Sequence, residues 1–219
     1  MSTNTYFWDT GFLSSSQEPP APLALIVLNQ NFEKATFLRL WLKCQWRIFA
    51  DGGSNRVYDT FNEEERLRYQ PDHIKGDFDS IRPNVRLWYE QQGVTVEEDH
   101  DQDSTDLMKC LRWVDQIEER QNIRLDVVIL GGLSGRLDHT VHTMSLLHKL
   151  RTTRPRIFVV SGESIGWVLD KVSERPCMLL VEPWITCTLA YRGITASNLI
   201  SGSLGLHAGC FLLELHPVC

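Results

Sequence analysis

The sequence predicts an α/β fold with a mainly parallel sheet and flanking helices, which is a Rossmann-like arrangement. Two observations predict it. Short apolar, β-branched runs alternate along the chain with stretches of helical composition, as in parallel sheets covered by helices. Nearly every run also ends in polar or glycine residues, as expected where the carboxyl ends of strands meet at a ligand-binding edge.

The predicted strands are the apolar runs, which are short enough for a sheet and bounded by turn-forming residues. They span residues 23–30, 46–53, 73–80, 94–101, 125–132 and 156–163. The stretches between them combine helix-forming residues with helical spacing of apolar side chains. These predicted helices cover 32–44, 62–69, 82–92, 104–121 and 137–153.

Composition excludes several classes of protein. A formal net charge of −6 argues against a nucleic-acid partner, which would need a basic surface. No apolar run approaches the roughly 20 residues that span a bilayer, so no membrane segment is expected. The six cysteines form no C-x-x-C pair and favour reduced thiols in a cytoplasmic protein. Residues 1–22 lack the pattern of a secretory signal, and we interpret them as a disordered N-terminal arm.

The stretch HIKGDFDSIR, residues 73–82, places Asp77 and Asp79 two positions apart at the end of a predicted strand. In an extended chain, residues two apart point the same way, so both carboxylates would face one spot. A turn in which each carboxylate accepts a backbone N–H is the alternative. The stretch DQDSTDLMKCL adds three further acids at a predicted helix start, including Asp106.

Carboxylates held close together repel and raise each other's pKa, so such a cluster usually surrounds a cation. A donor set of oxygen atoms without Cys or His suits Mg²⁺, which commonly shares its ligands with substrate phosphates. The acids therefore predict a magnesium site at the carboxyl edge of the sheet.

Two glycine-rich turns follow predicted strands. In GGLSGRLDH, residues 131–139, the glycines allow close backbone approach, and amides at a helix start favour an anion. Arg136 can bind phosphate oxygens, or it can simply pair with Asp138. The turn ADGGSNR, residues 50–56, has the same form and the same two interpretations.

Four motifs in this order, ADGGSNRVYD, GDFDSIRP, DQDSTDLMKCL and LGGLSGRLDH, resemble those of eukaryotic thiamine pyrophosphokinases. The resemblance implies a thiamine diphosphokinase, which transfers a pyrophosphoryl group from ATP to the hydroxyl of thiamine and releases AMP. It also implies a homodimer whose active sites lie between subunits, with Mg²⁺ as the metal and ATP and thiamine as ligands.

Site residues follow from the same motifs. Asp77, Asp79 and Asp106 match the acids around the metal and the triphosphate, and we expect them to be catalytic and metal-binding. The expected ATP- and substrate-binding residues are Asp51, Gly52, Gly53, Asn55, Gln102, Thr105, Lys109, Gly131, Gly132, Arg136 and Asp138.

The resemblance divides the chain at about residue 165. Residues 23–165 would form the α/β ATP-binding catalytic domain, and 166–219 a smaller, β-rich part that binds thiamine in the family. This last part is atypical, since only TASN (195–198) resembles the family's sequence there. Trp167 and Trp184 could stack on thiamine, although large aromatic residues more often pack in a core.

Two other functions remain open at this point. A catalytically impaired family member with an altered C-terminus would bind ATP without turnover. An Asp-x-Asp metal-dependent nucleotide-sugar transferase would explain the acids, but it would explain neither glycine-rich turn.

Overall fold

A computed structural model describes residues 7–9, 11–14, 18–162, 164–172, 175–181, 188–190 and 211–214. The predicted strands are confirmed, although each ends before the last residues of its predicted run, because those residues turn out of the sheet. The observed strands are β2 (Leu23–Val27), β3 (Trp46–Ala50), β4 (His73–Gly76), β5 (Thr95–Glu98), β6 (Asp126–Leu130) and β7 (Ile157–Val160).

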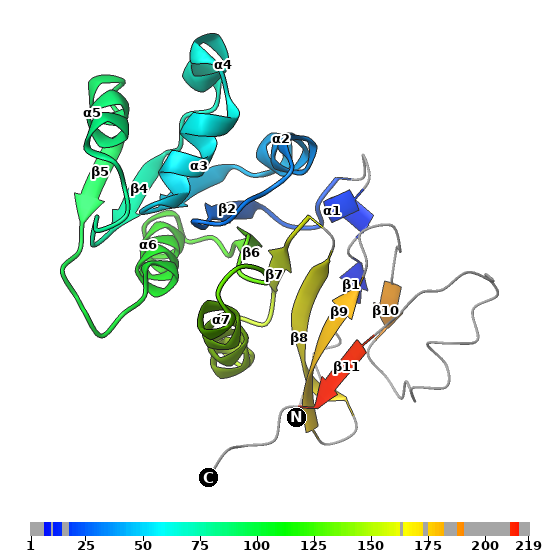
Figure 1. The fold of residues 1–219 in the computed structure, drawn as a ribbon. Helices are drawn as coiled ribbons and strands as arrows, with labels where there is room; N and C mark the ends of the chain where they lie inside the picture. Colours follow the sequence, from blue (N-terminus) through cyan, green and yellow to red (C-terminus); the bar gives the residue numbers. More distant parts are fainter. Residues whose placement is uncertain are drawn as a thin grey trace.

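These strands pair in parallel in the order β7-β6-β2-β3-β4-β5 (Figure 1). The chain runs outward from β2 to β5 and then returns to the other side of β2 to form β6. The direction of winding therefore reverses next to β2. In open parallel sheets a ligand crevice lies at such a reversal, outside the carboxyl ends of the strands.

Helices cover both faces of the sheet (Figure 1). On one side lie α2 (Lys34–Lys43), α3 (Gly53–Thr60), α4 (Glu63–Arg68) and α5 (Pro83–Gln91), and on the other α6 (Asp106–Gln121) and α7 (Leu137–Leu150). The predicted helices are confirmed. Helix α3 lies outside the predicted helical stretches, because we interpreted its first residues only as a glycine-rich turn.

The hydrophobic core consists of two layers, one on each face of the sheet. Leu23, Leu25 and Val27 pack with α2, α3 and α5, whereas Ala24 and Ile26 pack with α6 and α7. All five residues of β2 are buried because both faces are covered. This explains why the strand is continuously apolar instead of alternating.

Antiparallel strands extend the sheet beyond β7. They are β8 (Ile165–Val172), β9 (Arg175–Val181) and β11 (Phe211–Glu214), while β10 (Thr188–Ala190) pairs with β1 (Phe7–Asp9). The C-terminal part is thus β-rich, as expected. Trp167 is fully buried and packs beside Phe158 in the core, whereas Trp184 and TASN (195–198) lie outside the described residues.

The described part of residues 1–22 differs from the predicted disordered arm. A short helix, α1 (Gly11–Ser14), buries Phe12 and Leu13 completely, and the ring of Phe12 meets that of Phe158 edge-on at 5.5 Å. Two apolar side chains among polar neighbours are too weak a pattern to predict this contact. The burial of their apolar surface holds the segment against the sheet.

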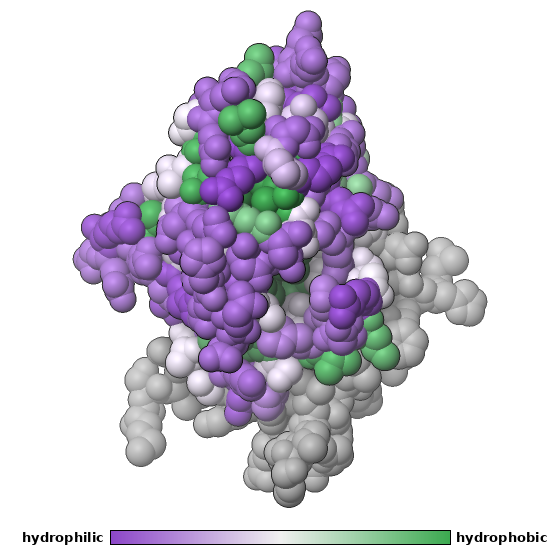
Figure 2. Space-filling model, turned by 60° about the vertical axis from the view of Figure 1, so that its left-hand side comes forward, coloured by the Kyte–Doolittle hydropathy of each residue, from purple (hydrophilic) through white to green (hydrophobic). Residues whose placement is uncertain are grey.

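Hydrophilic side chains dominate the face shown in Figure 2, where hydrophobic side chains form only small groups. Among the described helices, none combines the length and apolar character needed to cross a membrane.

Candidate functional site

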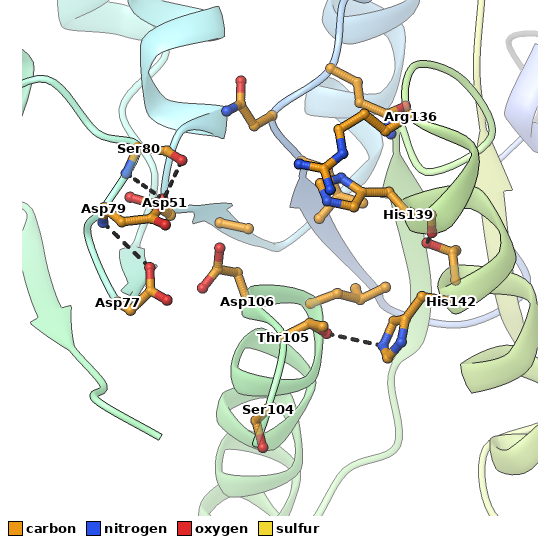
Figure 3. A pocket seen from close by; sticks show the side chains of 16 residues that line it. Asp51, Asp77, Asp79, Ser80, Ser104, Thr105, Asp106, Arg136, His139 and His142 are labelled. Atoms are coloured by element: carbon orange, nitrogen blue, oxygen red, sulfur yellow. Dashed lines mark hydrogen bonds between the residues drawn. The ribbon is translucent and has the colours of Figure 1, made fainter. Parts of the chain in front are cut away.

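A cavity of about 410 Å³ opens at the carboxyl ends of β2, β3 and β4, where the winding of the sheet reverses (Figure 3). The starts of α6 and α7 form its other walls. The lining residues are Leu28, Asn29, Gln30, Ala50, Asp51, Asp77, Asp79, Ser80, Ser104, Thr105, Asp106, Leu107, Arg136, His139, His142 and Thr143.

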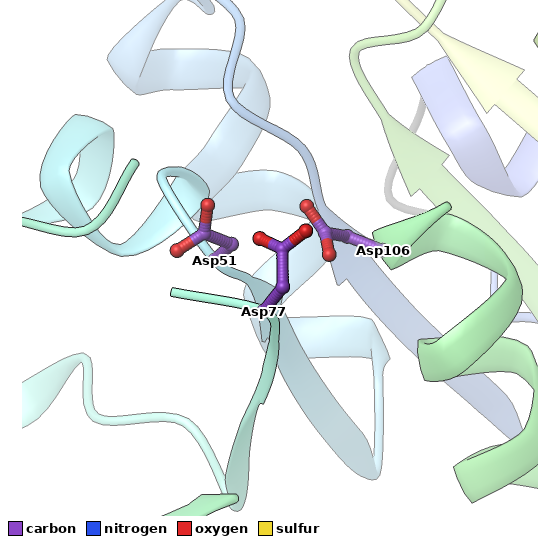
Figure 4. A group of neighbouring side chains, drawn as sticks. All are labelled: Asp51, Asp77 and Asp106. Carbon is purple, nitrogen blue, oxygen red and sulfur yellow. The ribbon is translucent and has the colours of Figure 1, made fainter. Parts of the chain in front are cut away.

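Three carboxylates meet in this cavity. Asp51 follows β3, Asp77 follows β4, and Asp106 begins α6; one oxygen atom from each lies within 4.8 Å of the others (Figure 4). Gly76 makes this approach possible, since a Cβ there would lie 2.6 Å from the Cβ of Asp51 and 3.1 Å from Oδ1 of Asp106. An oxygen-only donor set of this kind fits Mg²⁺.

The Asp51 carboxylate is also a structural acceptor. Its two oxygens accept the backbone N–H groups of Ser80 and Ile81, each at 3.0 Å, and the residue is only 1% exposed. Burial raises the pKa of Asp51 to about 6, and the nearby charge of Asp106 acts in the same direction, against the Ile81 and Ser80 hydrogen bonds. Burial, followed by the charge of Asp77, also raises the pKa of Asp106. A bound cation would relieve this penalty.

Lys109 lies beneath the acids. Its side chain is fully buried, with Nζ 3.7 Å from Oδ2 of Asp77 and 3.5 Å from Oδ1 of Asp106. The ammonium group therefore offsets part of the negative charge and fixes the two carboxylates from below. Lys109 is absent from the cavity lining, so it contacts the acids and not the cavity.

The turn GDFDS separates the two acids that an extended chain would have aligned. Strand β4 ends at Gly76, and Phe78 has a left-handed backbone with φ +62°. Asp77 joins the cluster, whereas Asp79 accepts a hydrogen bond from the Ser80 hydroxyl at 2.7 Å and donates its N–H to Asp77. Asp79 lines the cavity, but it is not part of the cluster, whose third carboxylate is that of Asp51.

The facing wall carries groups that can be cationic. Arg136, His139 and His142 come from the turn after β6 and the first turns of α7 (Figure 3). Nε2 of His142 lies 3.3 Å from the hydroxyl of Thr105 at the start of α6. The cavity thus places acids for a metal ion opposite groups that suit an anion.

Arg136 has the pairing that we considered as the alternative to phosphate binding. Its guanidinium donates to both oxygens of Asp138, at 3.1 and 2.6 Å, and lowers the pKa of that carboxyl. Both side chains are exposed, and Arg136 lines the cavity while Asp138 does not. The ion pair is accessible to a competing anion.

Other predicted residues shape the site from behind its walls. A Cβ at Gly53 would lie 2.3 Å from the carbonyl oxygen of Val27, and one at Gly52 2.3 Å from Nδ2 of Asn29. Asn55 donates to the carbonyl of Ser80 at 2.9 Å and so supports the turn after β4.

The remaining predicted residues are Gln102, Gly131 and Gly132, and none of them lines the cavity. Gln102 donates to the carbonyl of its near neighbour His100 at 3.4 Å. Gly131 and Gly132 have φ of +99° and +92°, so the turn after β6 requires glycine at both positions.

Sequence reasoning missed several lining residues. Asn29 and Gln30 follow β2 as Asp51 follows β3, so their position at a strand end was a usable signal. His139 and His142 are three residues apart, hence on one helix face, directly after the glycine-rich turn. The sequence carried no such signal for the other missed lining residues, which are Leu28, Ala50, Ser80, Ser104, Leu107 and Thr143.

Comparisons of the sequence agree with the motifs. A family model described as "Thiamin pyrophosphokinase, catalytic domain" matches residues 37–159, more than half of the chain. The chain is 40% identical over 163 residues to "Thiamine pyrophosphokinase 3" of Oryza sativa subsp. japonica, covering 69% of this chain and 59% of that protein. It is also 40% identical over 158 residues to "Thiamine pyrophosphokinase 2" of Arabidopsis thaliana, covering 68% and 58%. The chain thus spans less than two thirds of these relatives.

Comparisons of the fold point the same way. The solved "Thiamin pyrophosphokinase from Candida albicans" superimposes with a TM-score of 0.62 at 28% identity, covering 69% of this chain and 62% of that chain. The yeast thiamin pyrophosphokinase structure has a TM-score of 0.65 at 22% identity, covering 74% and 64%, which supports the fold alone.

Proposed function

Because this chain belongs to the thiamine pyrophosphokinase family, we propose that it is a thiamine diphosphokinase. It would transfer a pyrophosphoryl group from ATP to the hydroxyl of thiamine, giving thiamine diphosphate and AMP. One observation carries the proposal: a cavity at the reversal of the sheet has three clustered carboxylates on one wall and Arg136, His139 and His142 on the other.

The residues would act mainly by position and charge, as is usual in transfer of phosphoryl groups. Asp51, Asp77 and Asp106 would hold Mg²⁺, which when bound supplies positive charge beside the triphosphate. Arg136 and the two histidines would bind phosphate oxygens on the facing wall. The hydroxyl oxygen of thiamine would attack the β-phosphorus, and the bond from that phosphorus to the AMP oxygen would break.

The proton of the thiamine hydroxyl needs an acceptor or solvent. Asp79 and Asp106 both line the cavity and are the candidate bases. Asp79 is outside the cluster of Asp51, Asp77 and Asp106, so a metal ion held by those three would leave its carboxylate without a metal bond.

We also propose that the protein works as a cytoplasmic homodimer. The family resemblance supports the dimer, and Cys44 and Cys110, which are buried free thiols, fit a reducing compartment. Light scattering after size-exclusion chromatography tests the dimer, and a fully active monomer would contradict it.

The test of activity is direct. The full chain is incubated with ATP, thiamine and MgCl₂, and the products are separated by chromatography. We expect thiamine diphosphate and AMP in equal amounts, and neither without thiamine or with EDTA. Binding of MgATP by calorimetry without any product would instead support the impaired family member. Family membership argues against the nucleotide-sugar transferase.

A further inference from the structure

The side chain of Gln30 connects the two strands between which the winding of the sheet reverses. Gln30 follows β2, and its Oε1 accepts hydrogen bonds from the N–H of Gly132 at 2.8 Å, the N–H of Ser134 at 3.3 Å and the hydroxyl of Ser134 at 2.8 Å. These donors belong to the turn after β6, more than 100 residues later in the chain.

The backbone aims Gln30 at this turn. Leu28 N donates to the carbonyl of Leu130 at 3.0 Å, and Gln30 N donates to the carbonyl of Leu28 at 2.8 Å. The chain therefore turns directly after β2, and at the turn it is still hydrogen-bonded to the end of β6. A Cβ at Gly131 would lie 3.3 Å from the Cβ of Gln30, so the side chain lies against the turn.

The turn needs such an acceptor. Gly131, Gly132 and Gly135 all have positive φ, and glycines lose more conformational freedom on ordering than other residues. Three donors converge on one point, where a carbonyl oxygen can accept the two short hydrogen bonds and a longer third one, whereas an NH₂ group could accept none. Each bond contributes little alone, but together they select one shape of the turn.

The same contacts change the interpretation of the glycine-rich turn. The N–H of Gly131 donates to Val160 at 2.8 Å, and those of Gly132 and Ser134 are taken by Gln30. These three N–H groups are therefore already hydrogen-bonded to acceptors within the protein. What the ordered turn offers to the cavity is the side chain of Arg136 and the start of α7.

We propose that Gln30 is a positioning residue for nucleotide binding: its side-chain oxygen orders the turn after β6 and so holds Arg136 at the cavity. The functional part of this inference rests on the proposed use of ATP. The ordering of the turn can be measured without any substrate.

Two substitutions of Gln30 separate the effect of losing its oxygen acceptor from the effect of adding a charge. Gln30→Met has a similar length but offers no oxygen acceptor. Gln30→Glu keeps an oxygen in place but adds a negative charge to the cavity lining. Gln91→Met, at an exposed position of α5, is the matched control.

The first measurement is hydrogen exchange of the Gly132 and Ser134 amides by NMR. We expect exchange about tenfold faster in Gln30→Met, as for the loss of one or two net hydrogen bonds, and no change in Gln30→Glu or Gln91→Met. Equal exchange in Gln30→Met and wild type would overturn the ordering role.

The second measurement is calorimetric titration with MgATP, followed by the KM for ATP and for thiamine. We expect affinity for MgATP to fall about tenfold in Gln30→Met, because Arg136 is no longer held, with the KM for thiamine unchanged. Gln30→Glu should also bind MgATP more weakly, through repulsion, although its turn stays ordered.

The outcomes are distinct. Faster exchange with unchanged MgATP affinity would overturn positioning and leave Gln30 a structural residue. A wild type that binds MgATP but forms no thiamine diphosphate would contradict the proposed function, and the titration would still test Gln30. A wild type that binds no MgATP would overturn both.

Discussion

At the residue scale, the stability of the carboxylate cluster in the cavity depends on how its negative charges are balanced by cations. Three carboxylates share a small volume with one buried ammonium, that of Lys109. A single added cation at the cluster would bring the local charge close to neutral. Neutralising Asp77, which accepts neither of the backbone hydrogen bonds that Asp51 accepts from Ser80 and Ile81, should therefore affect metal binding far more than folding.

Asp77→Asn removes one charge without changing volume. We expect turnover to fall below detection while the melting temperature stays within a few degrees of wild type, because no hydrophobic contact is lost. Product chromatography and thermal unfolding measure the two effects. Asp103→Asn, at an exposed position outside the cavity lining, is the control. Full activity of Asp77→Asn at saturating MgCl₂ would exclude Asp77 as a necessary ligand.

The pH dependence of stability follows from Asp51. Its folded-state pKa is raised from 3.8 to about 6, so the folded protein binds this proton more tightly than the unfolded chain. This contribution to stability is fully present below pH 3.8 and is lost as pH rises through about 6.

Comparing wild type with Asp51→Asn isolates that effect. Without metal, we expect the melting temperature of the variant minus that of wild type to increase from pH 5 to pH 7.5. With MgCl₂ the trend should reverse, because the ionised carboxylate then gains a cation. Differential scanning calorimetry at both pH values checks this, and a difference independent of pH would contradict it.

At the element scale, the strand ends and helix starts bring the acids together only because glycines allow close contact. Gly76 ends β4 against Asp51 and Asp106, and Gly53 begins α3 against the carbonyl of Val27. At both positions the neighbouring atoms leave no room for a Cβ atom, so glycine is required there. Gly93 is different: its φ is +82° and nothing lies within 4 Å of an added Cβ.

Gly76→Ala and Gly93→Ala form a matched pair. Overpacking at Gly76 should cost about 1–3 kcal/mol of stability and displace Asp51 or Asp106, so activity should be lost. Backbone strain at Gly93 should cost about 1–2 kcal/mol and leave activity intact. Urea unfolding and product assays measure both. Equal activity of the two variants would show that the cluster tolerates a shift.

At the scale of the whole molecule, a second ionic network lies at the amino ends of the strands, away from the cavity. The guanidinium of Arg154 donates to both oxygens of Glu118, at 2.9 and 2.7 Å, to the carbonyl of Leu125 and to Asp115. Glu118 also accepts the N–H of Leu125 at 2.7 Å. The network joins α6 to the starts of β6 and β7.

Arg154→Met should lower stability by about 3–5 kcal/mol, because it leaves the buried carboxylate of Glu118 without its main partner. Arg82→Met breaks an exposed pair with Asp59 and should cost at most about 1 kcal/mol. Urea unfolding measures both values. Below its unfolding transition, Arg154→Met should retain MgATP affinity, since its contacts are remote from the cavity. A small loss of stability would show that water and Arg124, which already donates to Oε2 of Glu118 at 3.0 Å, are sufficient partners for this carboxylate.

The sequence by itself determined the order of the strands and helices and the edge at which the site lies. These features depend on local patterns: five consecutive apolar residues in β2 require cover on both faces, and polar residues after each strand lie at one edge of a parallel sheet. For the same reason the acids of the motifs could be predicted to converge.

Only the tertiary structure decided which side chains meet. Phe78 has a left-handed backbone directly after Asp77, and the third carboxylate of the cluster is that of Asp51, not that of Asp79. Lys109 proved to be buried under the acids, and Gln30 reaches a turn more than 100 residues away. Such contacts depend on backbone dihedrals and on distances between segments remote in the chain, and no local pattern of residues encodes either.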